Sequence, residues 1–155
     1  MRTPASIAGH PIHPMLVTLP IGLWVFSFVC DLVYAFGSGA VVWKTVALYT
    51  MTGGLVGALA AAVPGLIDLL SLPPGPKGTA LKHMAINLTV VALFAINLWM
   101  RWSAPDYGAA ERVPVWLSLI AIVLLSISGW LGGKLVYLGG VAVSAASDPP
   151  RSPRG

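Results

Sequence analysis

The sequence predicts an all-α membrane protein, a four-helix transmembrane bundle whose helices run antiparallel, up and down. Of its 155 residues, 57% are hydrophobic and only 9% are charged, whereas about a quarter of the residues in a soluble domain are charged. Four apolar stretches each have at least roughly the 20 residues that a helix needs to cross the hydrocarbon core of a bilayer. The alternation typical of barrel strands is absent, and only helices or closed barrels satisfy their backbone groups in lipid. We therefore expect one compact domain in the lipid bilayer.

The chain opens with residues 1–14, a polar and proline-rich segment at the membrane interface that contains the motif HPxHP, here HPIHP from His10 to Pro14. A residue before proline is pushed to an extended conformation, and proline suits the first turn of a helix. We therefore expect Pro14 to open the first helix, and His10 and His13 to lie on a stiff, non-helical segment.

Turn-forming residues separate the four predicted spans. Gly-Ser-Gly follows the first span, the breaker SLPPGPKG (residues 71–78) follows the second, and a wetter loop over residues 101–112 follows the third. The transmembrane domain as a whole covers residues 15–138, and residues 139–155 are predicted to form a flexible tail. The spans themselves are residues 15–36, 42–70, 79–100 and 114–135.

Four crossings place both termini on one side of the membrane, and more basic residues fall on that side. Because cytoplasmic loops carry an excess of Lys and Arg, we expect both termini to be cytoplasmic. The terminal side holds Arg2, Lys77, Lys82, Lys134, Arg151 and Arg154, and the other side holds Lys44, Arg101 and Arg112.

Small residues spaced by four predict which helix faces meet, because close backbone approach drives helix packing in lipid. A proline inside the second span, Pro64, frees the carbonyl of Ala60 one turn before Asp68. Exposed small-residue faces could serve a homo-oligomer as well as the bundle, so the oligomeric state stays open. The stripes are Gly53, Gly57, Ala61 and Gly65 in the second span, and Gly129 and Gly133 in the fourth.

Rare polar residues gather at the membrane face that the termini share. Ionisable groups at membrane depth are costly and usually persist for function or pairing. Asn87 follows His83 by four residues and therefore shares its helix face. The sequence thus predicts a site at this level, made of His10, His13, Asp68, His83, Asn87, Lys134 and Tyr137.

Several chemistries are open to three imidazoles and a carboxylate at one depth. Imidazole suits transition metals such as Zn, Cu, Fe and Ni, and two imidazoles from different segments could hold a haem iron. The same groups could form a proton relay, or bind a quinone headgroup through hydrogen bonds.

The polar residues also have structural explanations. A histidine beside proline can cap a helix, Asp68 can pair with Lys134 or Lys82, and Asn87 and Asn97 can hydrogen-bond between helices. Asp31 is expected to be solvated or paired with Lys44. Tryptophans near the span ends indicate an interfacial belt, made of Trp24, Trp43, Trp99, Trp102 and Trp116.

Other functional classes lack their signatures. The basic residues are scattered singly, which is not typical of a nucleic-acid surface. Cys30 is the only cysteine, so there is no internal disulfide and no CxxC motif. Motifs of phosphate-binding loops, zinc proteases and serine hydrolases are absent. The two halves show no matching broken segments of the kind that inverted-repeat transporters have.

Four stretches resemble one known family: GHPIHPMLVTLPIGLW at the start, PGLIDL around Asp68, KHMAINL around His83, and SGWLGGKLVYLGGVAV at the end. Together they span residues 9–143 and resemble the domain-of-unknown-function family numbered 2231, which consists of predicted four-helix bacterial membrane proteins. The resemblance implies a location in the bacterial inner membrane.

The same resemblance implies a role for particular positions. His10, His13, Asp68, His83 and Asn87 occupy the family's motif positions. Some relatives are joined to Rieske iron–sulfur or cytochrome-type domains, which implies a redox partner. Many members have a histidine in the last motif where this chain has Gly139. If that histidine binds a cofactor, this chain lacks one ligand.

We therefore expect a small membrane redox module that binds haem b or a transition metal near the cytoplasmic face. His13 and His83 are the expected ligands, His10 is the alternative first ligand, and Asp68 and Asn87 would orient imidazoles or handle a proton. Two alternatives stay open: a non-enzymatic structural or interaction protein, and a quinone- or proton-handling subunit of a respiratory complex. Supporting residues would be Lys134 and Tyr137.

Overall fold

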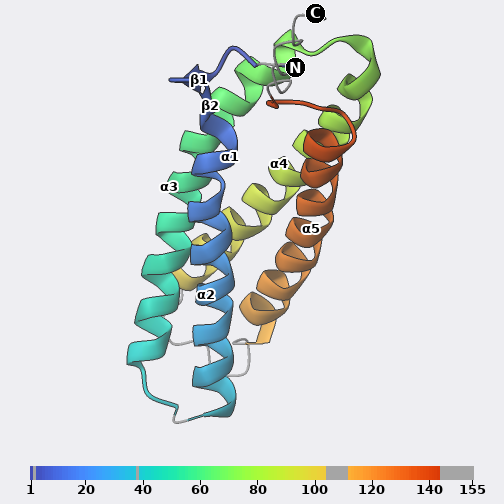
Figure 1. Cartoon of the computed structure of the whole chain (residues 1–155). Helices are drawn as coiled ribbons and strands as arrows, with labels where there is room; N and C mark the ends of the chain where they lie inside the picture. Colours follow the sequence, from blue (N-terminus) through green and yellow to red (C-terminus); the bar gives the residue numbers. More distant parts are fainter. Residues whose placement is uncertain (2, 38, 104–111, 144–155) are drawn as a thin grey trace, which may run out of the picture.

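The computed structural model of the protein describes residues 1, 3–37, 39–103 and 112–143. Four of its segments are long and apolar enough to cross a membrane, which confirms the predicted all-α fold with four spans. Figure 1 shows these helices side by side in an elongated bundle. The elements, in order, are β1 (Ser6–Ile7), β2 (His10–Pro11), α1 (Ile12–Leu16), α2 (Thr18–Phe36), α3 (Val42–Ser71), α4 (Pro74–Ser103) and α5 (Arg112–Tyr137).

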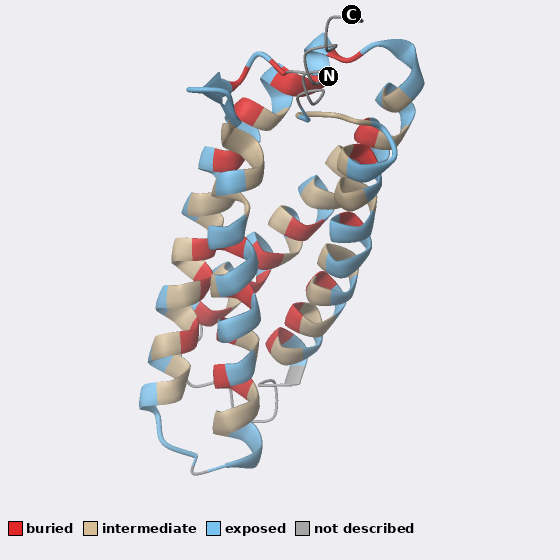
Figure 2. Ribbon diagram, viewed as in Figure 1, coloured by how far each residue is buried: buried red, intermediate tan, exposed pale blue. Residues whose placement is uncertain are grey.

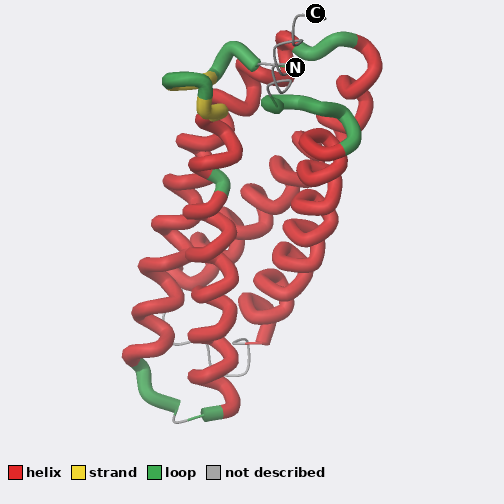
Figure 3. The backbone as a smooth tube through the Cα atoms, viewed as in Figure 1, coloured by secondary structure: helices red, strands yellow, loops and turns green. Residues whose placement is uncertain are grey.

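The N-terminal segment folds as a small hairpin that leads directly into α1. Ser6 lies opposite Pro11 and Ile7 opposite His10, and the two residues between the strands, Ala8 and Gly9, have φ of 49° and 81°. Positive φ at both positions is what a tight two-residue hairpin turn requires. Figure 3 shows the hairpin at the end of the bundle where the described chain begins.

His13 lies inside α1, so the prediction that it precedes the first helix is wrong. The helix begins at Ile12, which places Pro14 in its first turn. The first N–H groups of a helix have no partner within the helix, so a proline there removes no hydrogen bond. The helix can therefore start before the proline.

The predicted break between the second and third spans is present, but the same property of proline explains why it covers only Leu72 and Pro73 of residues 71–78. Helix α3 ends at Ser71 and α4 begins at Pro74, because Pro74 and Pro76 both fit the first turn of a helix. His83 consequently lies nine residues into α4, about 14 Å along the helix axis at the usual rise per residue.

Helix α4 also extends further than predicted at its other end, so Arg101 is helical and does not belong to a loop. The remainder of the predicted loop, residues 104–111, lies outside the described residues, as does the predicted tail beyond residue 143. Residues 139–143 form turns that close α5. There Gly140 has a φ of 60°, Val141 N–H donates to the Leu135 carbonyl, and Gly140 N–H donates to the Val136 carbonyl. The bond from Gly140 to Val136, with Gly140 at positive φ, is that of the αL cap, which glycine favours.

Small residues of α3 lie against α2, as their spacing predicts. A Cβ at Gly53 would lie 3.3 Å from the side chain of Leu23, and one at Gly57 would lie 3.2 Å from Pro20. The corresponding prediction for α5 is wrong, because a Cβ at Gly129 or Gly133 would meet nothing within 4 Å. Those two glycines do not mark a packed face of the described bundle.

The centre of the bundle is apolar and contains Trp24, Met51, Val90, Phe94 and Ala121. The rings of Trp24 and Phe94 stack with centroids 4.4 Å apart, and the indole N–H of Trp24 donates to the Met51 carbonyl. Trp24 is therefore a core residue, and its predicted place in the interfacial belt is wrong. Figure 2 shows buried positions on the inner helix faces and exposed positions on the outer faces, where lipid would lie.

Candidate functional site

Two histidines from different spans meet inside the bundle. The ring centroids of His13 on α1 and His83 on α4 lie 6.3 Å apart, with the ring planes perpendicular at 89°. Both residues are partly buried. The structure thus brings together the two imidazoles that the sequence singles out as ligands.

Each imidazole is held by a backbone carbonyl of the neighbouring helix. His13 Nδ1 lies 2.8 Å from the carbonyl oxygen of Ala61 on α3, and His83 Nδ1 lies 2.9 Å from that of Ser128 on α5. A carbonyl can only accept a hydrogen bond, so each Nδ1 donates its proton. Each neutral ring then keeps the lone pair on Nε2.

Glycines allow the rings to lie close to the neighbouring helices. A Cβ at Gly65 would lie 2.7 Å from His13 Nδ1, and a Cβ at Gly132 would lie 3.3 Å from His83 Cε1. The first distance is too short for any real side chain. Gly65, which belongs to the predicted stripe on α3, is therefore needed to make room for the His13 ring. On α5 the glycine that contacts a histidine is Gly132, and not Gly129 or Gly133 as the sequence predicts.

Asn87 completes the surroundings of His83. Its side-chain Nδ2 lies 3.0 Å from His83 Nε2, so the amide donates to the lone pair of the ring. The Ser128 hydroxyl lies 3.0 Å from His83 Nδ1. Among the described residues, no hydrogen bond reaches Nε2 of His13. The two rings therefore differ in the occupancy of the Nε2 lone pair and in the hydroxyl that lies beside Nδ1 of His83 alone.

The other predicted site residues lie elsewhere. His10 sits on β2, exposed, with its Nδ1 3.1 Å from the carbonyl of Ala8 in its own turn. Lys134 and Tyr137 are exposed, and Tyr137 keeps 87% of its surface open. The structure brings none of these three to the histidine pair.

Asp68 is buried and fixes the N-terminal segment. Its Oδ1 accepts the backbone N–H of Ala5 at 2.9 Å, and no ion pair with Lys134 or Lys82 occurs in the described part of the chain. The alternative that Asp68 forms such an ion pair is therefore wrong. Asp68 lies one helical turn beyond Gly65, so it ties the N-terminal segment down next to the His13 ring.

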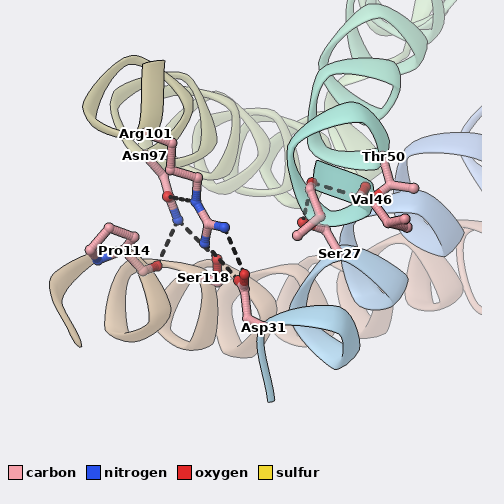
Figure 4. A network of polar contacts seen from close by, with 9 residues as sticks. Ser27, Asp31, Val46, Thr50, Asn97, Arg101, Pro114 and Ser118 are labelled. Carbon is pink, nitrogen blue, oxygen red and sulfur yellow. Dashed lines mark hydrogen bonds and ion pairs between the residues drawn. The ribbon is translucent and has the colours of Figure 1, made fainter. Parts of the chain in front are cut away.

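A second polar cluster, near the opposite end of the bundle, was missed by sequence reasoning. The Arg101 guanidinium makes two hydrogen bonds of 2.6 Å with the Asp31 carboxylate, and both side chains are buried. Arg101 Nε donates to Asn97 Oδ1 at 2.8 Å, and Asn97 Nδ2 donates to the Pro114 carbonyl and the Ser118 hydroxyl. Figure 4 shows this network in place.

The predicted fate of Asp31, solvation or a pair with Lys44, is thus wrong. A signal was present in the sequence, since Asp31 and Arg101 are opposite charges that the four-span topology puts near the same membrane face. The assignment of Arg101 to a loop concealed it.

The described part of the chain shows no group of protein side chains large enough to hold a metal ion by itself. Within residues 1, 3–37, 39–103 and 112–143, no three His, Cys, Asp or Glu side chains gather as a metal-holding group. Structural zinc needs four ligands and catalytic zinc usually three. The histidine pair instead supplies two ring nitrogens from opposite halves of the bundle.

Comparison with known protein families gives a match over most of the chain. The model of a family described as "Predicted membrane protein (DUF2231)" covers residues 9–145. No curated protein matches the chain, and no solved structure matches it.

Proposed function

Because the chain belongs to the DUF2231 family of predicted membrane proteins, we propose that it is a small redox module of the bacterial inner membrane in which His13 and His83 hold a haem b. The observation that carries the proposal is the placement of the two rings. Two imidazoles that bind one metal from opposite sides, with bonds of about 2.0–2.1 Å, have centroids about 6.3–6.5 Å apart. The measured separation is 6.3 Å.

The hydrogen bonds of the rings support the same proposal. Metal-binding histidines usually donate their other ring N–H to a carbonyl or carboxylate, which fixes the tautomer and the ring orientation. His13 and His83 both do this through Nδ1. Two histidines would suffice to hold a haem iron, whereas a structural zinc ion needs four ligands.

A bound haem would supply one-electron transfer, and the chain would supply binding and orientation. The Ala61 and Ser128 carbonyls hold the two rings. Asn87 donates to His83 Nε2, so it would have to release this lone pair if the ring bound a metal. Gly139 lies in the turn after α5 and has no side chain that could bind a metal, so the ligand set proposed here does not include this position.

The proposed orientation has both termini in the cytoplasm, from the excess of basic residues on that side. A Rieske or cytochrome-type protein is the proposed electron partner.

An absorbance spectrum tests the proposal. The protein is expressed with added haem precursor, purified in mild detergent and assayed for iron. We expect a Soret band and about one haem per chain, both lost in His13→Ala and in His83→Ala. His10→Ala is the matched control and should retain the haem, because His10 faces its own turn. A wild-type protein without a Soret band or stoichiometric iron would refute the proposal.

A second candidate function is a non-enzymatic membrane scaffold in which the histidines serve packing. The observation in its favour is that His83 already has partners at both ring nitrogens, Ser128 at Nδ1 and Asn87 at Nε2. This candidate predicts that His83→Ala lowers the melting temperature while no bound species is lost.

A further inference from the structure

Contacts across the centre of the bundle follow a constant sequence separation. His13 meets His83, Trp24 stacks on Phe94, and Asp31 pairs with Arg101. In each case the second residue lies 70 positions after the first. The three contacts succeed one another in the same order on α1–α2 and on α4, so these two segments run in the same direction.

Contacts within each half of the bundle match as well. The His13 ring bonds to a carbonyl and lies against a glycine of α3, and the His83 ring does the same on α5. Ser27 donates to the Ala47 carbonyl of α3 as Asn97 donates to the Pro114 carbonyl of α5. The corresponding positions on the second helices are 67 apart: Ala47 and Pro114, Ala61 and Ser128, Gly65 and Gly132.

The packing of whole helices is also the same in the two halves. Helix α2 packs against α3 within the first half, and α4 packs against α5 within the second. Between the halves, α2 contacts α5 and α3 contacts α4. If α2 exchanges places with α4 and α3 with α5, the contact between α2 and α5 becomes the contact between α4 and α3. A twofold axis along the bundle requires this relation.

We infer that the chain consists of two equivalent helix-hairpin units, residues 12–71 and 74–137, related by a pseudo-twofold axis, and that His13 and His83 are equivalent halves of one site on that axis. Parallel repeats of this kind have their axis along the membrane normal, unlike the inverted repeats that the sequence argues against. The ligand of the site rests on the proposed function: a flat group with two equivalent faces and a metal at its centre fits two equivalent donors.

Asp31 and Arg101 determine which units pair. They occupy equivalent positions but carry opposite charges, and both are buried. Two first units placed together would oppose two aspartates, and two second units would oppose two arginines. Only unlike units make the ion pair, so repulsion disfavours pairing between identical units.

Exchange of residues between equivalent positions tests the repeat without any cofactor. Asp31→Arg and Arg101→Asp each place like charges together and should lower the melting temperature in detergent by about 10 °C or more. The double variant should recover most of this loss. If a single variant does not fold, a double variant that folds still shows the recovery.

A simple ion pair would also tolerate this reversal, so a larger exchange is needed. Adding Ser27→Asn and Asn97→Ser exchanges a second pair of matched polar residues, because the amide introduced on α2 can then donate to the Ala47 carbonyl as Asn97 donates to that of Pro114. Equivalent units predict that this quadruple variant melts at or above the double variant. A quadruple variant that melts clearly below the double would overturn the inference.

The equivalence of His13 and His83 is tested separately, by haem binding. His13→Gly and His83→Gly should lose haem to a similar extent, and added imidazole should restore the Soret band in both. If the wild type binds no haem while the residue exchange succeeds, the proposed function fails and the repeat stands. If haem binds while the exchange fails, the repeat falls and the proposed function stands.

Discussion

Gly65→Ala is the most direct test of how His13 is held. The added Cβ would lie 2.7 Å from His13 Nδ1 and 2.8 Å from Cε1, whereas carbon atoms in contact prefer about 3.5–4.0 Å. The imidazole therefore has to move by about 1 Å, which is enough to break its hydrogen bond with the Ala61 carbonyl.

The cost follows from these two effects. Overpacking a well-packed site costs about 1–3 kcal/mol, and a buried donor left without its partner brings the cost toward the upper value. Alanine has a better helix propensity than glycine, which returns up to about 1 kcal/mol. The net loss is about 1–2 kcal/mol, or about 2–8 °C in melting temperature for a chain of this length.

Two other glycines give a graded series with the same chemical change. At Gly132 the new Cβ would lie 3.3 Å from His83 Cε1, and at Gly129 it would meet nothing within 4 Å. Circular dichroism during heating in detergent should rank the variants Gly65→Ala, Gly132→Ala and Gly129→Ala from least to most stable. Equal melting of Gly65→Ala and Gly129→Ala would show that His13 does not lie against α3.

Three further predictions concern single side chains. Arg101→Met leaves the buried Asp31 carboxylate without its two short hydrogen bonds and should cost about 3–5 kcal/mol; adding Asp31→Leu should recover much of it in a double-mutant cycle, and additive losses would contradict the pairing. Trp24→Phe keeps the aromatic stack but loses the N–H donor to Met51, so thermal unfolding should show a loss of about 1 kcal/mol. Asn87→Ala removes a donor that competes for the His83 lone pair, so a haem titration should show affinity at least as high as wild type, and a tenfold weaker affinity would refute competition.

The spans and the level of the histidine pair could be predicted because hydropathy acts locally. A run of apolar residues has to form a helix in lipid, and the depth of a residue follows from its distance to the helix end. His13 and His83 therefore fell at one level even though both helix starts were misplaced. The misplacement came from proline, which disrupts a helix interior but fits its first turn, where Pro14, Pro74 and Pro76 lie.

The contacts of Trp24 and Asp31 could not be predicted in the same way. Trp24 lies in the middle of the first span, Ile12–Phe36, where hydropathy does not distinguish an inward from a lipid-facing side chain. It is buried because Gly54 of α3 leaves room for its indole, with a hypothetical Cβ only 2.5 Å away. The partner of Asp31 depends on which helix lies diagonally opposite. Hydropathy does not specify helix neighbours, so the sequence offered Lys44 as readily as Arg101.

The equivalence of the two halves is hidden in the sequence for a physical reason. At contact-matched positions most residues differ: tryptophan corresponds to phenylalanine, aspartate to arginine, and serine to asparagine. Packing and charge pairing require two partners that complement each other, not two identical residues. The residues of such a pair can therefore differ while the contact between them is kept. Two matched positions are identical, the pair His13 and His83 and the pair Gly65 and Gly132. A planar ligand with two equivalent faces would require the same donor, and the same space for it, from both units. The contacts Trp24–Phe94 and Asp31–Arg101 require only that the two side chains complement each other.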